Sequence, residues 1–168
     1  RFSLIQNISA GNDIRYIPEK VEASRNFVNK LWNAAKFVNM YINDLSNVDE
    51  NNIKFMPEDK WILTKLSKLI NEVTDNIDRF EIGVAIQKIY DFVWSDLCDS
   101  YIEMVKPRLY EKSGESYISA IWTLNYTLLS AIKLLHPYMP YVTEEIYQNL
   151  NKSCDSIMQE IWPEAKFD

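Results

Sequence analysis

The sequence reads RNFVNKLWNAAKF from Arg25 to Phe37, and this stretch predicts an amphipathic helix. At 100° per residue, one arc of the helix is aliphatic, and the opposite arc collects Arg, Asn, Lys and one Phe. Asn is a poor helix former, and a face that only meets water is usually filled with Glu, Lys or Gln. The polar arc therefore suggests a binding face. Its members are Arg25, Asn26, Asn29, Lys30, Asn33, Lys36 and Phe37, opposite Phe27, Val28, Leu31, Ala34, Ala35, Val38 and Ile42.

This polar arc is chemically suited to unpaired RNA. Cations contact phosphates, Asn amides both donate to and accept from base edges, and an exposed Phe stacks on a base of any identity. The ordinary alternative is a bundle helix with one packed face and one solvated face. Periodicity alone does not separate these two interpretations.

Composition and charge limit the kind of domain and the kind of binding. A chain of 168 residues with 47% apolar content fits one folded domain, and three Gly and six Pro favour helix over hairpins. The net charge of −6 argues against a nucleic-acid binder that relies on bulk positive potential. The stretch from Arg15 to Phe37 has five cations and two anions, a net of +3, which leaves −9 for the rest of the chain. Any contact with RNA must therefore be local.

Few residues of the sequence support catalysis, metal binding or membrane insertion. Cys98 and Cys154 have no second Cys or His at metal-ligand spacing, which favours reduced thiols over a zinc site. The single histidine, His136, precedes a proline and is expected to be a helix C-cap rather than a catalytic base. Phosphate-binding glycine loops, long apolar runs and a signal-peptide pattern are absent from the sequence. We expect a chain without catalytic activity of its own and without membrane contact.

Apolar stripes of period 3.6 predict four long helices. Short connections between them, with Asn-rich or Pro-containing breaks such as Ser46–Asn52, favour antiparallel neighbours. The expected fold is all-α, an up-and-down bundle of four long antiparallel helices with short terminal helices. The predicted ranges are Pro18–Leu45, Pro57–Phe80, Glu81–Met104 with an end or kink at Pro107, and Ser116–His136, followed by a short helix over Val142–Leu150 and preceded by a loop over Ser9–Asp13.

Three stretches of the sequence resemble the anticodon-binding domain of valyl-tRNA synthetases. They are the one quoted above, YDFVWSDLCDSYIEMVKPRLY at Tyr90–Tyr110, and LLHPYMPYVTEEIY at Leu134–Tyr147. Their order and spacing match the family over essentially the whole chain. The last stretch is shared by the valine, isoleucine and leucine enzymes of class I, whereas the first two are similar to the valine enzymes. Ser100 stands where the family usually has Trp, which we interpret as a packing change.

The resemblance implies recognition of the anticodon stem and loop of valine tRNA, with adenine and cytosine read at the second and third anticodon positions. For a parent enzyme it implies ATP-dependent attachment of valine to tRNA, with ATP and Mg as cofactors. Neither adenylate-forming signature occurs here, so we expect a piece of that enzyme that binds no cofactor. Residues 1–17 resemble a connector from the catalytic domain, and 18–168 the anticodon-binding domain. A cytoplasmic monomer is expected.

Carried over to this sequence, the resemblance places RNA recognition on the same polar arc. Phe37 is the expected stacking platform, and Asn29 and Asn33 are the expected partners of base edges. Alternatively, Asn33 caps a neighbouring loop, and Phe37 lies as core beneath the segment Ser46–Phe55. The expected phosphate contacts are Arg25, Lys30 and Lys36.

Other interpretations stay open. Lys106 and Arg108 form a second basic candidate, for which a solvated helix end is the alternative. The whole chain could instead be the anticodon-binding domain of an isoleucine or leucine synthetase, in which the base-reading face differs. A third class is a protein-interaction bundle that docks through an exposed apolar patch and does not bind RNA. Binding of valine, isoleucine and leucine tRNAs separates the three.

Overall fold

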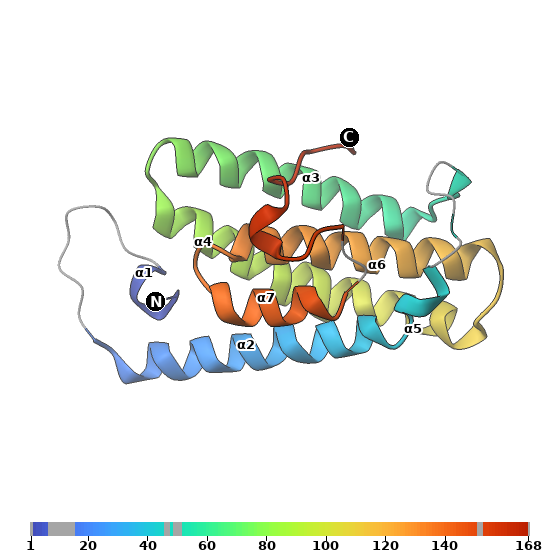
Figure 1. Cartoon of the computed structure of the whole chain (residues 1–168), viewed down its shortest axis with the longest axis horizontal. Coiled ribbons are helices and arrows are strands. Elements are labelled where there is room, and N and C mark those ends of the chain that lie inside the picture. Colours follow the sequence, from blue (N-terminus) through green and yellow to red (C-terminus); the bar gives the residue numbers. More distant parts are fainter. Residues whose placement is uncertain (1, 7–15, 46–47, 49–51, 151–152, 168) are drawn as a thin grey trace.

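The computed structural model describes residues 2–6, 16–45, 48, 52–150 and 153–167, and these contain helices and turns but no strand. Four long helical segments run up and down beside one another (Figure 1). The predicted all-α up-and-down bundle is confirmed. The predicted loop Ser9–Asp13 and most of the break at Ser46–Asn52 lie outside the described residues. The long segments are α2 (Pro18–Asn39), α3 (Pro57–Asp78), the rod α4–η3–α5 (Ile82–Asp91, Phe92–Tyr101, Ile102–Glu111) and α6 (Gly114–Leu135), and the short ones are α1 (Phe2–Ile5), η1 (Ile42–Leu45), α7 (Pro140–Gln148) and η4 (Ile157–Gln159).

The core lies between the long segments, where the aliphatic stripes meet. Helix α6 is the central element and contacts α2, α3, α4, α5 and α7. By length and composition α6 could cross a membrane, but 67% of its most apolar window is buried inside the bundle. Burial against these neighbours explains the apolar composition of α6, because a helix that is covered on most sides needs few polar residues.

Helix α2 is shorter than predicted, because it ends at Asn39 and not near Leu45. The backbone N–H of Met40 donates to the carbonyl oxygen of Phe37, and that of Tyr41 donates to the carbonyl oxygen of Val38, which tightens the last turn. The chain then continues as the short 3₁₀ helix η1.

The third rod does not end at Pro107, which lies inside α5. A proline in a helix removes one backbone hydrogen bond and costs about 3 kcal/mol. Here Val105 and Leu109, on either side of the proline, are fully buried, and Arg108 is bonded to α3. Tertiary packing therefore holds the helix past the proline as far as Glu111.

The middle of this rod is a π-helix, η3, which the sequence pattern did not predict. The Ser100 hydroxyl donates to the carbonyl oxygen of Ser95 at 2.8 Å, within the wide turns of this segment. Segment η3 packs against α2 and α3, so it lies between the two edges of the bundle. Widened helical turns of this kind are frequent near functional sites.

Candidate nucleic-acid interface

Helix α2 lies along one edge of the bundle (Figure 1). Its inner side packs against η3, α6 and α7, and buries Phe27, Leu31 and Val38. The predicted aliphatic arc is thus the packed arc, and the polar arc is turned away from the core.

Four of the predicted residues form an open strip along the outer side of α2. Arg25, Asn29, Asn33 and Lys36 are all exposed, and they fall within an arc of about 80° at the pitch of an α-helix. None of the four makes a hydrogen bond or ion pair with another described residue. Asn33 therefore caps no loop in the described part of the chain. The strip presents two cations and two amides that have no hydrogen-bond or ion-pair partner in this part of the chain.

Lys30 lies off this strip and is already paired. Its Nζ atom is 2.5 Å from Asp99 Oδ1 and 3.8 Å from the centroid of the Trp94 ring, both on η3. Only 24% of its side chain is exposed. Lys30 thus joins α2 to η3 in this structure, and a phosphate contact by Lys30 requires it to exchange Asp99 for the phosphate.

Phe37 lies at one edge of the open strip. Its ring is half-buried, packs against the core and meets the buried Tyr41 ring edge to face at 5.5 Å between centroids. One side of Phe37 therefore belongs to the core, while the rest of the side chain remains accessible beside the strip.

The opposite edge of the strip carries Trp32, an aromatic residue outside the predicted polar arc. Trp32 is half-buried, and Lys36 Nζ lies 5.8 Å from its ring centroid. On a helical projection Trp32 falls between the aliphatic and polar arcs, so the pattern assigns it neither to the core nor to the binding face. The available signal was the spacing from Lys36, because residues i and i+4 are neighbours on a helix surface.

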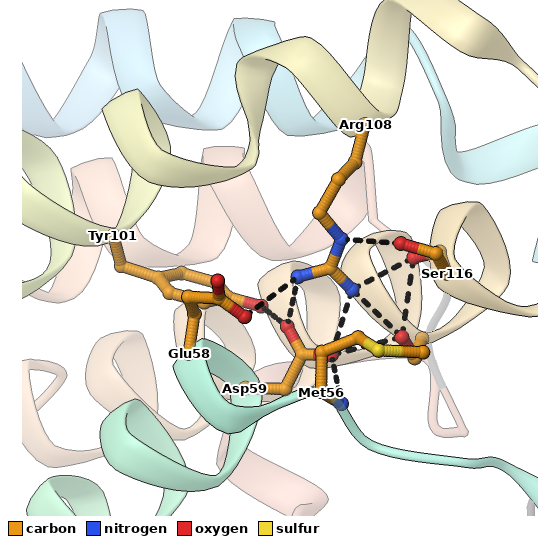
Figure 2. Close-up of polar contacts among 7 residues, drawn as sticks. Met56, Glu58, Asp59, Tyr101, Arg108 and Ser116 are labelled. Atoms are coloured by element: carbon orange, nitrogen blue, oxygen red, sulfur yellow. Dashed lines mark hydrogen bonds and ion pairs between the residues drawn. The ribbon is translucent and has the colours of Figure 1, made fainter.

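The second basic candidate is not a surface site as a whole. Arg108 forms a two-pronged ion pair with Asp59, in which Nη1 is 2.9 Å from Oδ1 and Nη2 is 2.8 Å from Oδ2 (Figure 2). Asp59 is fully buried and also accepts hydrogen bonds from the Tyr101 hydroxyl at 2.6 Å and the Ser119 hydroxyl at 2.8 Å. The alternative of a solvated helix end is therefore wrong for Arg108. Lys106 pairs with the exposed Glu103 instead.

The pKa of Asp59 reflects this enclosure. Burial alone would raise its pKa, but hydrogen bonds from Arg108, Tyr101 and Ser119 hold it below the ordinary value. The carboxylate stays ionised inside the protein and fixes α3 against α5 and α6. A signal was present in the sequence, since Asp59 lies in register with the apolar stripe that continues at Ile62.

His136 occupies the C-cap position of α6, as predicted. Its Nδ1 atom lies 2.7 Å from the Thr143 hydroxyl oxygen, which joins the ends of α6 and α7. Burial lowers the pKa of His136. Burial thus favours the neutral form of the ring, which acts through this hydrogen bond. Cys98 and Cys154 are free thiols, also as predicted.

The fold is thus an all-α bundle that carries an open strip of amides and cations on an edge helix. The family model for the anticodon-binding domain of tRNA ligases matches residues 59–168, and the chain belongs to this family. The match begins at Asp59, so it covers the bundle from α3 onward. The family resemblance found in the sequence is confirmed.

Curated relatives extend the similarity through α2. The chain is 46% identical to the valine–tRNA ligase of Clostridium perfringens over 97% of its length, and 42% identical to that of Bacillus anthracis over its whole length. It spans 19% of the length of each of these relatives. A crystal structure of the ternary complex of Agrobacterium radiobacter LeuRS, tRNA and LeuAMS shares the fold, with a TM-score of 0.68 at 21% identity over 98% of this chain and 19% of that one.

Proposed function

We propose that this chain recognises the anticodon stem and loop of valine tRNA, as the anticodon-binding domain of a valine–tRNA ligase. The observation that carries the proposal is the open strip on α2, whose four polar side chains are exposed and make no hydrogen bond or ion pair with another described residue. Membership of the family and the identity of 42–46% to valine–tRNA ligases support the choice of tRNA.

In this proposal the strip holds an opened loop by local contacts. Arg25 and Lys36 bind phosphates, and Asn29 and Asn33 pair with base edges. Phe37 stacks on a base from its edge of the strip. Lys30 adds a phosphate contact after it leaves Asp99. A wrong base is rejected because it leaves polar groups at the interface unpaired.

We further propose that the parent enzyme attaches valine to its tRNA with ATP and Mg²⁺, in the cytoplasm and as a monomer. Residues 1–17 form the connector from its catalytic domain. In this proposal ATP and Mg²⁺ bind to that catalytic domain. Binding of the anticodon arm by this chain orients the acceptor end toward it.

A gel-shift titration with transcribed valine, isoleucine and leucine tRNAs tests this proposal. We expect the valine tRNA to bind most tightly. Tighter binding of isoleucine or leucine tRNA would assign the domain to one of those enzymes. Equal weak binding of all three, without salt dependence, would favour a protein-interaction bundle.

A further inference from the structure

A groove of about 300 Å³ runs between α2 and α7, directly beside the open strip. Helix α7 lies alongside α2 (Figure 1). The floor of the groove is apolar, because it is formed by the buried side chains of Ala35, Ile146 and Leu150. Trp32 and Lys36 line it from α2, so the groove and the open strip share one edge.

The upper part of this groove is lined by polar groups that have free hydrogen-bonding capacity among the described residues. Glu145 on α7 is exposed, and its carboxylate makes no hydrogen bond or ion pair with any described residue. The indole N–H of Trp32 likewise has no acceptor in the described part of the chain. Asn149 donates its amide N–H to the backbone oxygen of Glu145 at 2.8 Å, which leaves the amide oxygen of Asn149 available.

These groups suit one unstacked nucleotide. An aromatic ring beside an apolar floor offers a stacking surface for a base, and Lys36 at the rim offers a cation to the phosphate next to it. A carboxylate only accepts hydrogen bonds, so it pairs with an exocyclic amino group at ring position C4 or C6, as in cytosine and adenine. Uracil presents a carbonyl oxygen at the same place, which a carboxylate repels.

We propose that the groove binds one splayed base that carries an exocyclic amino group, with Trp32 stacked on it and Glu145 accepting its amino proton. This inference rests on the proposed function. It adds a second base-binding position to the interface, since Trp32 and Phe37 lie on opposite edges of the open strip. The strip then carries the RNA backbone between two bases turned to either side.

The test for Glu145 compares amino and carbonyl bases in one RNA. The probe is the anticodon stem-loop of valine tRNA, with each loop cytidine replaced by uridine and each loop adenosine by inosine in turn. We expect the present chain to lose about tenfold in affinity at one loop position. Glu145→Gln should abolish this discrimination at that position alone, because a Gln amide donates to a carbonyl oxygen as well as accepting from an amino group.

Glu111→Gln is the matched control, because it removes the same charge from an exposed carboxylate at the end of α5. It should keep the discrimination. If Glu145→Gln keeps the discrimination at every position while the stem-loop still binds, the groove is not a base site and the proposed function stands. If the unaltered chain binds this stem-loop no better than one of unrelated sequence, the proposed function fails and the groove assignment with it.

Trp32 gives a second readout that does not depend on Glu145. Trp32→Leu should weaken stem-loop binding about tenfold, whereas Trp61→Leu, at a half-buried Trp on α3, should not. The chain has five Trp, so the indole N–H signal that disappears in Trp32→Phe identifies Trp32 by NMR. That signal should move when RNA is added to the unaltered chain. An unmoved signal at saturating RNA would overturn the role of Trp32, even if Trp32→Leu failed to fold.

Discussion

Two sets of polar groups on amphipathic helices differ in whether they have partners inside the protein. One is the open strip on α2, and the other is the Asp59 cluster, formed by Asp59, Tyr101, Arg108 and Ser119. In the Asp59 cluster both carboxylate oxygens receive hydrogen bonds from other elements of the bundle. In the open strip no described residue bonds to any of the four side chains. Polar groups with internal partners stabilise the fold, while exposed groups without them are available to a ligand.

The sharpest test of this contrast is Asp59→Ala. Removal of the Asp59 carboxylate leaves the partly buried Arg108 with only the more distant Glu58 as a charge partner, and Tyr101 without its acceptor. We therefore expect a loss of about 3–5 kcal/mol in the free energy of unfolding. Urea denaturation measures it. Glu58→Ala is the control, since Glu58 is 43% exposed and lies 3.8 Å from Arg108. Equal losses in the two variants would mean that burial of Asp59 adds nothing.

Glu160 is a second carboxylate with partners inside the protein, and it makes the stability of the fold depend on pH. Hydrogen bonds from Lys133, Ser153 and Tyr147 outweigh burial, which acts in the opposite direction, and lower the pKa of Glu160 from an ordinary 4.5 to about 2. Because the folded pKa is the lower one, the stabilisation is complete above pH 4.5 and is lost as the pH falls toward 2. The loss is roughly 3 kcal/mol on the usual scale of free energy per pKa unit.

Unfolding midpoints between pH 5 and pH 2 measure this loss. Glu160→Gln should be less stable than the unaltered chain at pH 6, and its stability should fall less steeply with acid. Asp59 also has a lowered pKa, so a smaller acid dependence remains in the variant. An unchanged slope in Glu160→Gln would show that the Lys133 pair does not control acid stability.

The two regions also differ in how far the sequence predicted them. The open strip follows from local periodicity, since Arg25, Asn29 and Asn33 share one side of a single helix. The Asp59 cluster joins residues about 50 positions apart, and no local pattern pairs Asp59 with Arg108. The structure rules out a helix end at Pro107, which the sequence could not show because the burial that holds α5 together is a tertiary effect.

On α2, local reasoning located the exposed side of the helix but not the elements that pack beside it. Lys30 and Phe37 belong to the predicted arc, yet η3 pairs with Lys30 and Tyr41 covers part of Phe37. Trp32 became a candidate only when α7 was placed beside α2. A helical projection gives the direction of a side chain, while the packed elements decide which groups remain open.

Asn33→Ala tests the open strip, and it should change the free energy of unfolding in the opposite direction to Asp59→Ala. Alanine is the better helix former, so we expect the free energy of unfolding to rise by about 0.5 kcal/mol. Binding of valine tRNA should weaken by about tenfold, because one base edge loses its partner. Thermal unfolding and a binding titration on the same sample measure both. A variant that loses more than about 1 kcal/mol would place Asn33 among the structural residues.

The smallest effect separates two lysines of the same helix. Each phosphate contact on a single strand contributes about −0.7 to the slope of log K against log salt. Lys36→Gln should therefore reduce the slope by about that amount. Lys30→Gln should reduce the slope by less, because Asp99 already neutralises Lys30 in the free protein. A phosphate can bind Lys30 only if the ion pair between Lys30 and Asp99 breaks. Titrations at four salt concentrations measure both slopes, with Lys112→Gln, an exposed lysine after α5, as control. Equal reductions for Lys30 and Lys36 would show that Lys30 leaves Asp99 completely when RNA binds, so that the open strip widens toward η3 in the complex.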